Sequence, residues 1–352
     1  MNVKISNSKK YKYNSSLDFI RFISVSFVIL DHWRIDTSNK NLHILLSFIN
    51  DGRFGVDIFF VISGFLITYG LLLQKDSVDF TFKKDIASFY IKRFFRIFPI
   101  YYLLIFFLYI INFNDTRTNF LYYATYSSNI LISKYESWNI GLPHTWSLSV
   151  EEQFYLIWPF VVFCIPRKYL LKISGLLILL SLVFISIFKS DVIIYFITLL
   201  PSCLMTLSAG TILAIYYKYN LVGLNRHKKS IYLVGIFALL IYIFIKIFNL
   251  QYVLLNKMVY TSFAFSSILY AINNPNKFKQ MPFVYLGKIS YGIYLYHYVI
   301  GQIPNKYFIG ISASFWLIYI VKLILLFSIS VLSYNYFESR LINFAKKKLS
   351  HK

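Results

Sequence analysis

The chain is divided into apolar runs that are each long enough to cross a membrane. An apolar helix of about 20 residues spans the hydrocarbon core of a bilayer, and such runs follow one another along the whole 352-residue sequence. Only 14% of the residues are charged, against about 25% in an ordinary soluble domain. Lipid rather than water must therefore cover most of the surface. The sequence predicts an all-α integral membrane protein.

We predict about ten transmembrane helices. The predicted spans are residues 17–33, 54–73, 97–113, 146–165, 173–188, 193–217, 231–247, 257–273, 284–303 and 313–336. The eighth span is the weakest because residues 248–273 carry several polar groups, and residues 120–132 are a candidate re-entrant or interfacial segment. Nine and eleven spans are therefore the alternatives.

The distribution of Lys and Arg predicts the orientation in the membrane. With ten spans, roughly two thirds of the 36 Lys and Arg residues fall on the side that holds both termini, which the positive-inside rule makes the cytoplasmic side. Topology and anionic lipid headgroups thus account for the net charge of +22, and no nucleic-acid partner is expected.

We expect one transmembrane domain over residues 1–352, with cytoplasmic tails at 1–16 and 338–352 and no appended soluble domain. The richness in Ile, Phe, Tyr, Lys and Asn is typical of an AT-rich bacterial gene, which predicts a multi-pass protein of the bacterial inner membrane.

Ionisable residues at membrane depth are costly, and they are functional candidates for that reason. The first span contains Asp18, Arg21, Asp31 and His32. Arg21 and His32 are eleven residues apart, which puts them on one face of a helix roughly 16 Å apart along its axis. Alternatively, Arg21 extends to the lipid headgroups and His32 marks the outer interface.

The second and third spans contain further candidates. Asp57 opens the second span, where an unpaired carboxylate is rare, and Ser63 and Gly64 interrupt its middle, as at sites of close helix packing or of function. Arg93 and Arg96 lie one helical turn apart at the boundary of the third span. Their guanidinium groups suit phosphate, and anchoring by the positive-inside rule is the alternative.

A dense polar cluster enters the fourth span. It comprises His144, Trp146, Ser147, Glu151 and Glu152. Ser147 or Ser149 can cap the helix, and a glutamate near a helix N-terminus is favourable. Capping would need only one carboxylate, which leaves the second for function. In the ninth span, His297 is either a hydrogen-bonded core residue or part of a site.

Together these segments resemble the acyltransferase-3 family of membrane-bound acyltransferases. The elements of that family occur in order as Arg21-x10-His32, GVDIFFVISGFLIT at 55–68, Arg93-x-x-Arg96, WSLSVEEQFYLIWP at 146–159, LGKISYGIYLYH at 286–297 and YNYFESR at 334–340. The resemblance implies transfer of an acyl group, usually acetyl, from cytosolic acyl-CoA to a carbohydrate hydroxyl of a surface polysaccharide, O-antigen, peptidoglycan or lipid-linked precursor. It also implies that Arg21 and His32 are required and that Arg93 and Arg96 serve the CoA donor. Relatives often have glycines around the first-span Arg, where this chain has Phe19 and Phe22.

Acyl transfer to a hydroxyl needs a base, a stabilised oxyanion and a positioned donor. We expect His32 to act as the general base, oriented by Glu151 or else by Asp57 or Asp31. Arg21 is expected to stabilise the thioester carbonyl or a CoA phosphate. The residues expected to support the substrate cavity are Asp31, Asp57, Ser63, Gly64, His144, Trp146, Ser147, Glu152 and His297. Acetyl-CoA is the expected co-substrate, and no metal or bound cofactor is expected.

Two mechanistic and functional alternatives stay open. No Ser or Cys has the context of a nucleophile, which favours direct transfer over an acyl-enzyme, although an acyl-imidazole on His32 is the other route. The alternative function is a transporter or flippase of a glycolipid or lipid-linked sugar, with the same polar groups lining a pathway through the membrane. The absence of a repeated half in the sequence disfavours transport.

Overall fold

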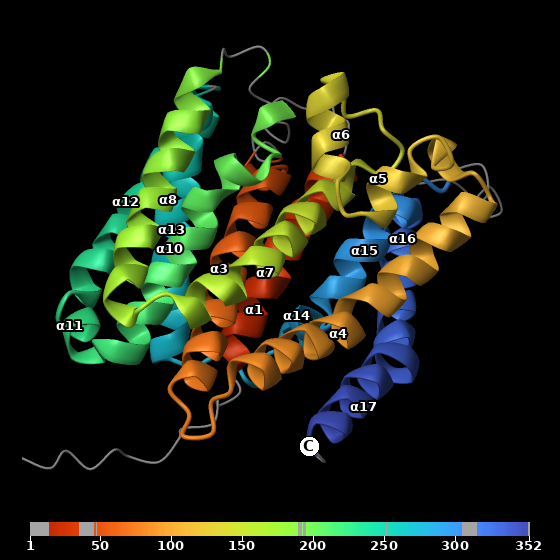
Figure 1. Ribbon diagram of the computed structural model, residues 1–352. Helices are drawn as coiled ribbons and strands as arrows, with labels where there is room; N and C mark the ends of the chain where they lie inside the picture. Colours follow the sequence, from red (N-terminus) through yellow and green to blue (C-terminus); the bar gives the residue numbers. More distant parts are fainter. Residues whose placement is uncertain are drawn as a thin grey trace, which may run out of the picture.

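The fold is a bundle of helices (Figure 1). The computed structural model describes residues 14–34, 46, 48–188, 192, 195–250, 252–304 and 315–350, and within these residues every regular element is a helix. The helices that run back and forth along the bundle are α1 (Ser15–His32), α3 (Gly52–Lys75), α4 (Phe82–Ile110), α7 (Trp146–Cys164), α8 (Arg167–Ile187), α10 (Leu200–Tyr219), α12 (Lys228–Ile247), α13 (Val253–Asn273), α15 (Ser290–Gly301) and α16 (Phe315–Ser333). Shorter helices at the two ends are α5 (Phe120–Ala124), α6 (Ser128–Tyr135), α11 (Leu221–Arg226), α14 (Phe283–Lys288) and α17 (Ser339–Ser350). The prediction of an all-α chain is confirmed.

Six described helical stretches are long and apolar enough to cross a membrane by length and composition. They are Gly52–Lys75, Phe82–Ile110, Arg167–Ile187, Leu200–Tyr219, Lys228–Ile247 and Trp316–Leu349. The predicted spans over α1, α7, α13 and α15 fall outside this group. α15 has only 12 residues, α1 carries Asp18, Arg21 and Asp31, and α7 has Glu151 and Glu152 in its second turn. The total of ten spans therefore stays a prediction.

The candidate re-entrant segment at 120–132 forms α5 and the first half of α6. These two short helices lie side by side at the end of the bundle opposite α11, α14 and α17 (Figure 1). The hydroxyl of Tyr101 on α4 donates to the carbonyl of Tyr123 at 2.9 Å, and that of Tyr102 donates to the carbonyl of Ala124 at 2.7 Å. The two bonds fix the end of α5 against α4.

α3 is the centre of the bundle and contacts α1, α7, α10 and α13. Two glycines bring α3 and α10 together. A Cβ atom on Gly64 would lie 2.0 Å from the carbonyl oxygen of Leu207, and one on Gly210 would lie 2.1 Å from that of Val61. Small residues that let two backbones touch are typical of helix pairs in membranes. Gly64 therefore serves helix packing.

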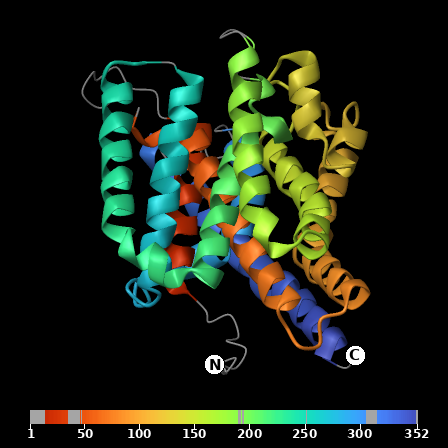
Figure 2. The same cartoon turned by 60° about the vertical axis from the view of Figure 1, so that its left-hand side comes forward.

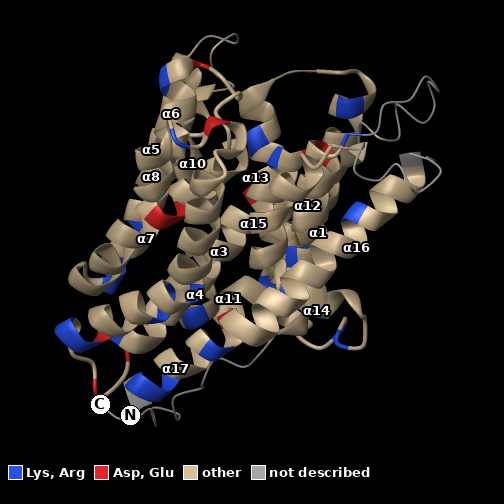
Figure 3. Ribbon diagram, turned by 90° about the vertical axis from the view of Figure 1, so that its right-hand side faces the viewer, with Lys and Arg blue, Asp and Glu red and all other residues tan. Residues whose placement is uncertain are grey.

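The described part of the chain starts and finishes at the same end of the bundle (Figure 2). At the start of α1, the side-chain amide of Asn14 donates to the carbonyl of Ala271 at 3.2 Å, and Ser15 donates to that of Pro275 at 2.8 Å. Lys and Arg gather at this end, around α11, α14 and α17 (Figure 3). It is referred to as the basic end.

The last helices form one continuous element. α16 passes through a π-helical turn (Tyr334–Glu338) into α17. α17 packs against α4, where the rings of Phe344 and Phe95 are 5.4 Å apart, and Ala345 is buried. Most of the predicted tail at 338–352 is therefore a helix held against the bundle.

Replacing Gly64 by Ala should destabilise the bundle. The new methyl group would meet the backbone of α10, and such overpacking costs about 1–3 kcal/mol. Gly70→Ala on the same helix is the matched control, because a Cβ atom there meets nothing within 4 Å. The thermal-unfolding midpoint of the purified protein should fall for the first variant only, and equal midpoints would contradict the packing argument.

Candidate active site

A cavity of about 620 Å³ extends from the basic end toward the middle of the bundle. Residues of α1, α3, α4, α7 and α15 form its walls, and α14, α17 and the π turn contribute residues near the basic end. Its acidic and basic lining residues are Asp18, Arg21, Arg93, Arg96, Glu151, Lys288, Glu338 and Lys346. The cavity is therefore strongly charged although apolar helices enclose it.

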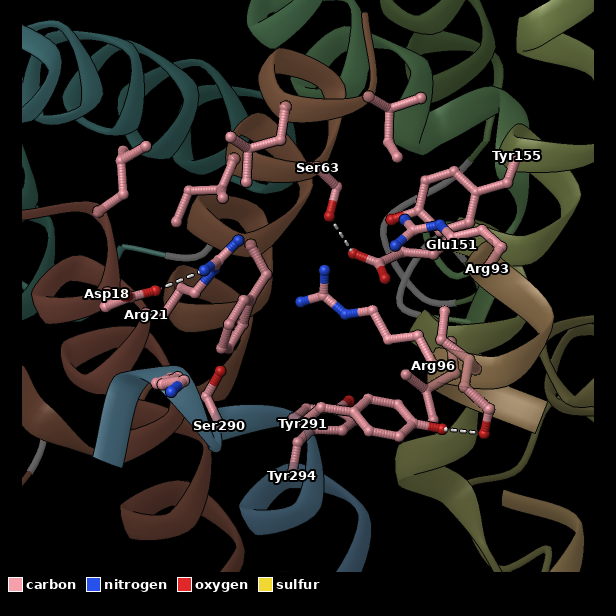
Figure 4. Close-up of a pocket in the computed structure, with 18 of the residues that line it drawn as sticks. Asp18, Arg21, Ser63, Arg93, Arg96, Glu151, Tyr155, Ser290, Tyr291 and Tyr294 are labelled. Carbon is pink, nitrogen blue, oxygen red and sulfur yellow. Dashed lines mark hydrogen bonds and ion pairs between the residues drawn. The ribbon is translucent and has the colours of Figure 1, made fainter. Parts of the chain in front are cut away.

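Three arginines from two helices converge in this cavity (Figure 4). Arg21 donates to the carboxylate of Asp18, one turn earlier on α1, at 2.6 Å. The guanidinium of Arg93 stacks on Tyr155 at 3.7 Å from the ring centroid, and its Nε is buried without a hydrogen-bond partner. Arg96 projects into the space between the other two. Within the described residues, neither Arg93 nor Arg96 forms an ion pair. The lining holds five basic residues against three acidic ones, and this excess of positive charge favours a bound anion.

Glu151 extends into the same cavity from α7. Its Oε1 accepts a hydrogen bond from the hydroxyl of Ser63 on α3 at 2.6 Å (Figure 4). Neighbouring residues on a helix point about 100° apart, and Glu152 does not line the cavity. Only one of the two adjacent glutamates therefore shares the cavity with the arginines.

His32 and His297 contact each other at the end of α1 that lies away from the basic end. The distance from His32 Nδ1 to His297 Nε2 is 2.9 Å. His297 is completely buried, whereas His32 is exposed. Trp33 fixes the pair, because its indole N–H donates to the carbonyl of His297 at 2.9 Å.

The hydrogen bonds of His297 determine which nitrogen of His32 is free. His297 Nδ1 lies 2.5 Å from the carbonyl oxygen of Tyr294, which can only accept, so this nitrogen carries the proton. In a neutral imidazole the other nitrogen is then an acceptor, and His32 Nδ1 donates to it. His32 Nε2 keeps an unprotonated lone pair. That is the tautomer required of a general base.

A smaller cavity of about 260 Å³ lies beside His32. It is lined by His32, Trp33, Arg34, Tyr298, Gly301, Gln302, Ile318, Tyr319 and Lys322. None of these residues lines the larger cavity. The histidine pair thus belongs to a different compartment from the arginines.

A hydrogen-bonded layer separates the two cavities. The Tyr294 hydroxyl donates to the carbonyl of His144 at 2.8 Å and has only one proton, so Ser147 donates to Tyr294 at 2.6 Å. His144 stacks on Tyr298 with ring centroids 4.9 Å apart, and Trp146 packs edge-on against Phe60 in a neighbouring contact. Ser147 therefore does not cap α7, which begins one residue earlier at Trp146.

The other predicted carboxylates are paired. Asp57 forms a buried ion pair with Lys257 of α13, and Asp31 accepts from Arg34 at 2.8 Å. The partner of His32 Nδ1 is thus the imidazole of His297, rather than Glu151, Asp57 or Asp31 as the sequence suggested. In the described part of the chain, no three His, Cys, Asp or Glu side chains are placed to hold a metal ion.

Sequence reasoning missed several residues of this region. Lys257 is an ionisable residue at membrane depth, the same signal that selected Asp57, but the predicted eighth span began at that lysine. The predicted tail includes Glu338, yet this residue is buried in the π turn and accepts from Ser333 at 2.9 Å. Tyr155 and Tyr294 lie within the family segments at 146–159 and 286–297, but tyrosine is abundant in this chain and neither residue stands out by type.

Comparisons with known proteins agree on one family. The acyltransferase domain described as Acyl_transf_3 matches residues 14–335. The chain is 28% identical to the peptidoglycan O-acetyltransferase OatA of Listeria monocytogenes, over 93% of this chain and 56% of that protein. It is also 28% identical to the O-acetyltransferase OatA of Staphylococcus aureus, over 93% of this chain and 57% of that protein. The chain thus spans about half the length of these relatives. No solved structure matches it.

The Asp57–Lys257 pair should stabilise the bundle without serving the chemistry. Lys257→Met leaves a buried unpaired carboxylate, which costs about 3–5 kcal/mol, so the unfolding midpoint should drop sharply. Adding Asp57→Leu removes the orphaned charge and should restore most of the loss. If the double variant is as unstable as the single one, the ion pair is not the cause.

Proposed function

The chain belongs to the acyltransferase-3 family, and we propose that it is a membrane-bound O-acetyltransferase that moves acetyl from acetyl-CoA to a hydroxyl of a cell-surface carbohydrate. The observation that carries the proposal is the pairing of an anion-binding cavity with an oriented histidine. Helix α1 contributes a residue to each of them: Arg21 lines the cavity, and His32 belongs to the histidine pair. A transferase that takes its donor from one face and its acceptor from the other needs this arrangement.

The large cavity suits the donor. A CoA diphosphate is a strong anion, and Arg93 and Arg96 offer planar forks of donors that no carboxylate of the described residues engages in an ion pair. Arg21 shares the cavity with them, so we assign it to the phosphates rather than to the thioester carbonyl. Its ion pair with Asp18 holds the guanidinium in place.

The distance along α1 fits the donor's flexible arm. Arg21 and His32 are eleven residues apart, roughly 16 Å at 1.5 Å per residue. An extended pantetheine arm has a similar length. Phosphates held at Arg21, Arg93 and Arg96 would therefore let the thioester reach the layer formed by Tyr294 and Ser147, beside the histidine pair.

His32 is the proposed general base. Its Nε2 takes the proton of the acceptor hydroxyl as the hydroxyl oxygen attacks the thioester carbonyl, a step that requires the Tyr294–Ser147 layer between the two cavities to open. The C–S bond of the tetrahedral intermediate then breaks, and His32 returns the proton to the departing sulfur, so that one acetyl ester and one CoA thiol form. His297 accepts from His32 Nδ1 throughout and stabilises the imidazolium that forms transiently.

The acceptor enters from the opposite end in this proposal. The small cavity beside His32 is lined by polar groups suited to a sugar, among them Gln302 and Tyr298. The Listeria relative is a peptidoglycan O-acetyltransferase, which favours peptidoglycan over O-antigen as the acceptor. No observation favours the transporter alternative, because the family that matches is an acyltransferase.

The membrane topology completes the proposal. We place the basic end in the cytoplasm, where acetyl-CoA is made, by the positive-inside rule. α1, α7, α13 and α15 then join the six most apolar helical stretches in crossing the inner membrane of a bacterium, which gives ten spans and puts both described ends of the chain in the cytoplasm.

Replacing His32 by Ala should abolish acetyl transfer while leaving donor binding intact. Removal of a general base typically lowers kcat by about 10²- to 10⁴-fold. The measurement is release of CoA thiol by the purified protein with a saccharide acceptor, together with acetyl-CoA affinity. Activity that survives the change would refute the assignment. Radiolabelled acetyl retained on His32 without acceptor would instead establish an acyl-enzyme.

His297 is a positioning residue, and its replacement should be milder. We expect His297→Ala to lower kcat by about 10- to 100-fold, because His32 loses the partner that fixes its tautomer. His297→Gln should recover part of the loss, since the amide oxygen can accept from His32 Nδ1. The acidic limb of the pH–rate profile should also move in the Ala variant, whereas a purely structural role would leave that limb unchanged.

A further inference from the structure

Two lysines line the large cavity in addition to the arginines. Lys288 is the last residue of α14, and Lys346 lies on α17. Both line the cavity, and both are exposed. The arginine cluster and the lysine pair are therefore two cationic groups at different positions in one cavity.

The placement of Lys346 is fixed by packing. α17 is held against α4 through Phe344 and Phe95, and Ala345 is 2% exposed beside it. The π turn before α17 adds a residue to one turn, which rotates the following helical face relative to α16. Ile342 and Lys346, one turn apart on α17, line the cavity as a result.

Neither lysine is neutralised by the cavity's own carboxylates. Among the described ion pairs, Asp18 engages Arg21, and none involves Lys288 or Lys346. The carboxylate of Glu338 accepts a hydrogen bond from the hydroxyl of Ser333. The Nζ of Lys288 instead lies 5.2 Å from the ring centroid of Tyr334. This part of the large cavity thus offers two ammonium groups and an aromatic ring to a ligand.

We propose that Lys288 and Lys346 form a second phosphate subsite, which binds the 3′-phosphate of the CoA donor. This proposal rests on the proposed function. CoA carries a diphosphate next to its pantetheine arm and a separate phosphate monoester on the ribose beyond it. Arginine forks suit the diphosphate, and the compact, mobile ammonium groups of lysines suit a terminal monoester near solvent.

The subsite would select the donor. Phosphopantetheine carried on a protein, and CoA lacking its 3′-phosphate, offer nothing to the lysines. Such donors should still reach the arginines and the histidine pair, but they should bind more weakly. The chain would thereby distinguish free CoA thioesters from other acyl carriers.

The test compares CoA with 3′-dephospho-CoA on the purified full chain in phosphatidylcholine nanodiscs. Exposed ion pairs contribute modestly, so we expect about a threefold loss of CoA affinity for Lys288→Gln or Lys346→Gln and about tenfold for the pair. Affinity for dephospho-CoA should not change. Lys348→Gln is the matched control, because Lys348 is exposed on the same helix but does not line the cavity.

The outcomes separate this inference from the proposed function. Equal affinity of the wild-type protein for CoA and dephospho-CoA, with acetyl transfer intact, would overturn the subsite alone. Absence of both CoA binding and transfer would overturn the proposed function. A double variant that loses both ligands equally would show that the lysines do not recognise the 3′-phosphate, and would also refute the subsite.

A lipid phosphate has the same chemistry as the proposed ligand group. Repeating the titrations in nanodiscs that contain phosphatidylglycerol distinguishes the two sources. If the lysines serve the donor, the preference for CoA over dephospho-CoA persists in both membranes. If they bind lipid headgroups, the effect of the substitutions follows the phosphatidylglycerol content and not the 3′-phosphate, which would overturn the proposal.

Discussion

The cost of holding charge away from water organises this molecule. An ionised group inside an apolar bundle requires a partner, and the structure contains both paired and unpaired cases. Asp57 and Lys257 compensate each other across α3 and α13. Arg93 and Arg96 lack such a carboxylate within the described residues. The first arrangement neutralises its own charges, while the second leaves two guanidinium groups for the anionic donor proposed above.

Much of this division could be predicted from the sequence, because polarity in an apolar run is a strong signal. It identified Arg21, Arg93 and Arg96, and the structure brings all three to one cavity. The helical character and the close packing at Gly64 also follow from composition and spacing. These features depend on local periodicity, which a single sequence displays.

Contacts between distant segments could not be predicted in the same way. The partner of His32 is 265 residues away on α15, and helical periodicity does not reveal which helices are neighbours. The expectation of a carboxylate partner followed the commonest catalytic pattern, whereas the bundle supplies an imidazole. From the sequence alone, Lys288 and Lys346 are two of the many basic residues that the positive-inside rule explains. Only the packing of α14 and α17 brings them to the cavity.

The glycine contact between α3 and α10 has a consequence for how substrates exchange. The backbones that touch at Gly64 and Gly210 cannot separate without opening a void. We therefore expect α3 and α10 to move as one rigid unit. Motion that would admit and release the proposed donor is then expected on the other side of the cavity, where Phe95 of α4 packs against Phe344 of α17. Substrate exchange would thus move α4 and α17 while α3 and α10 stay in place.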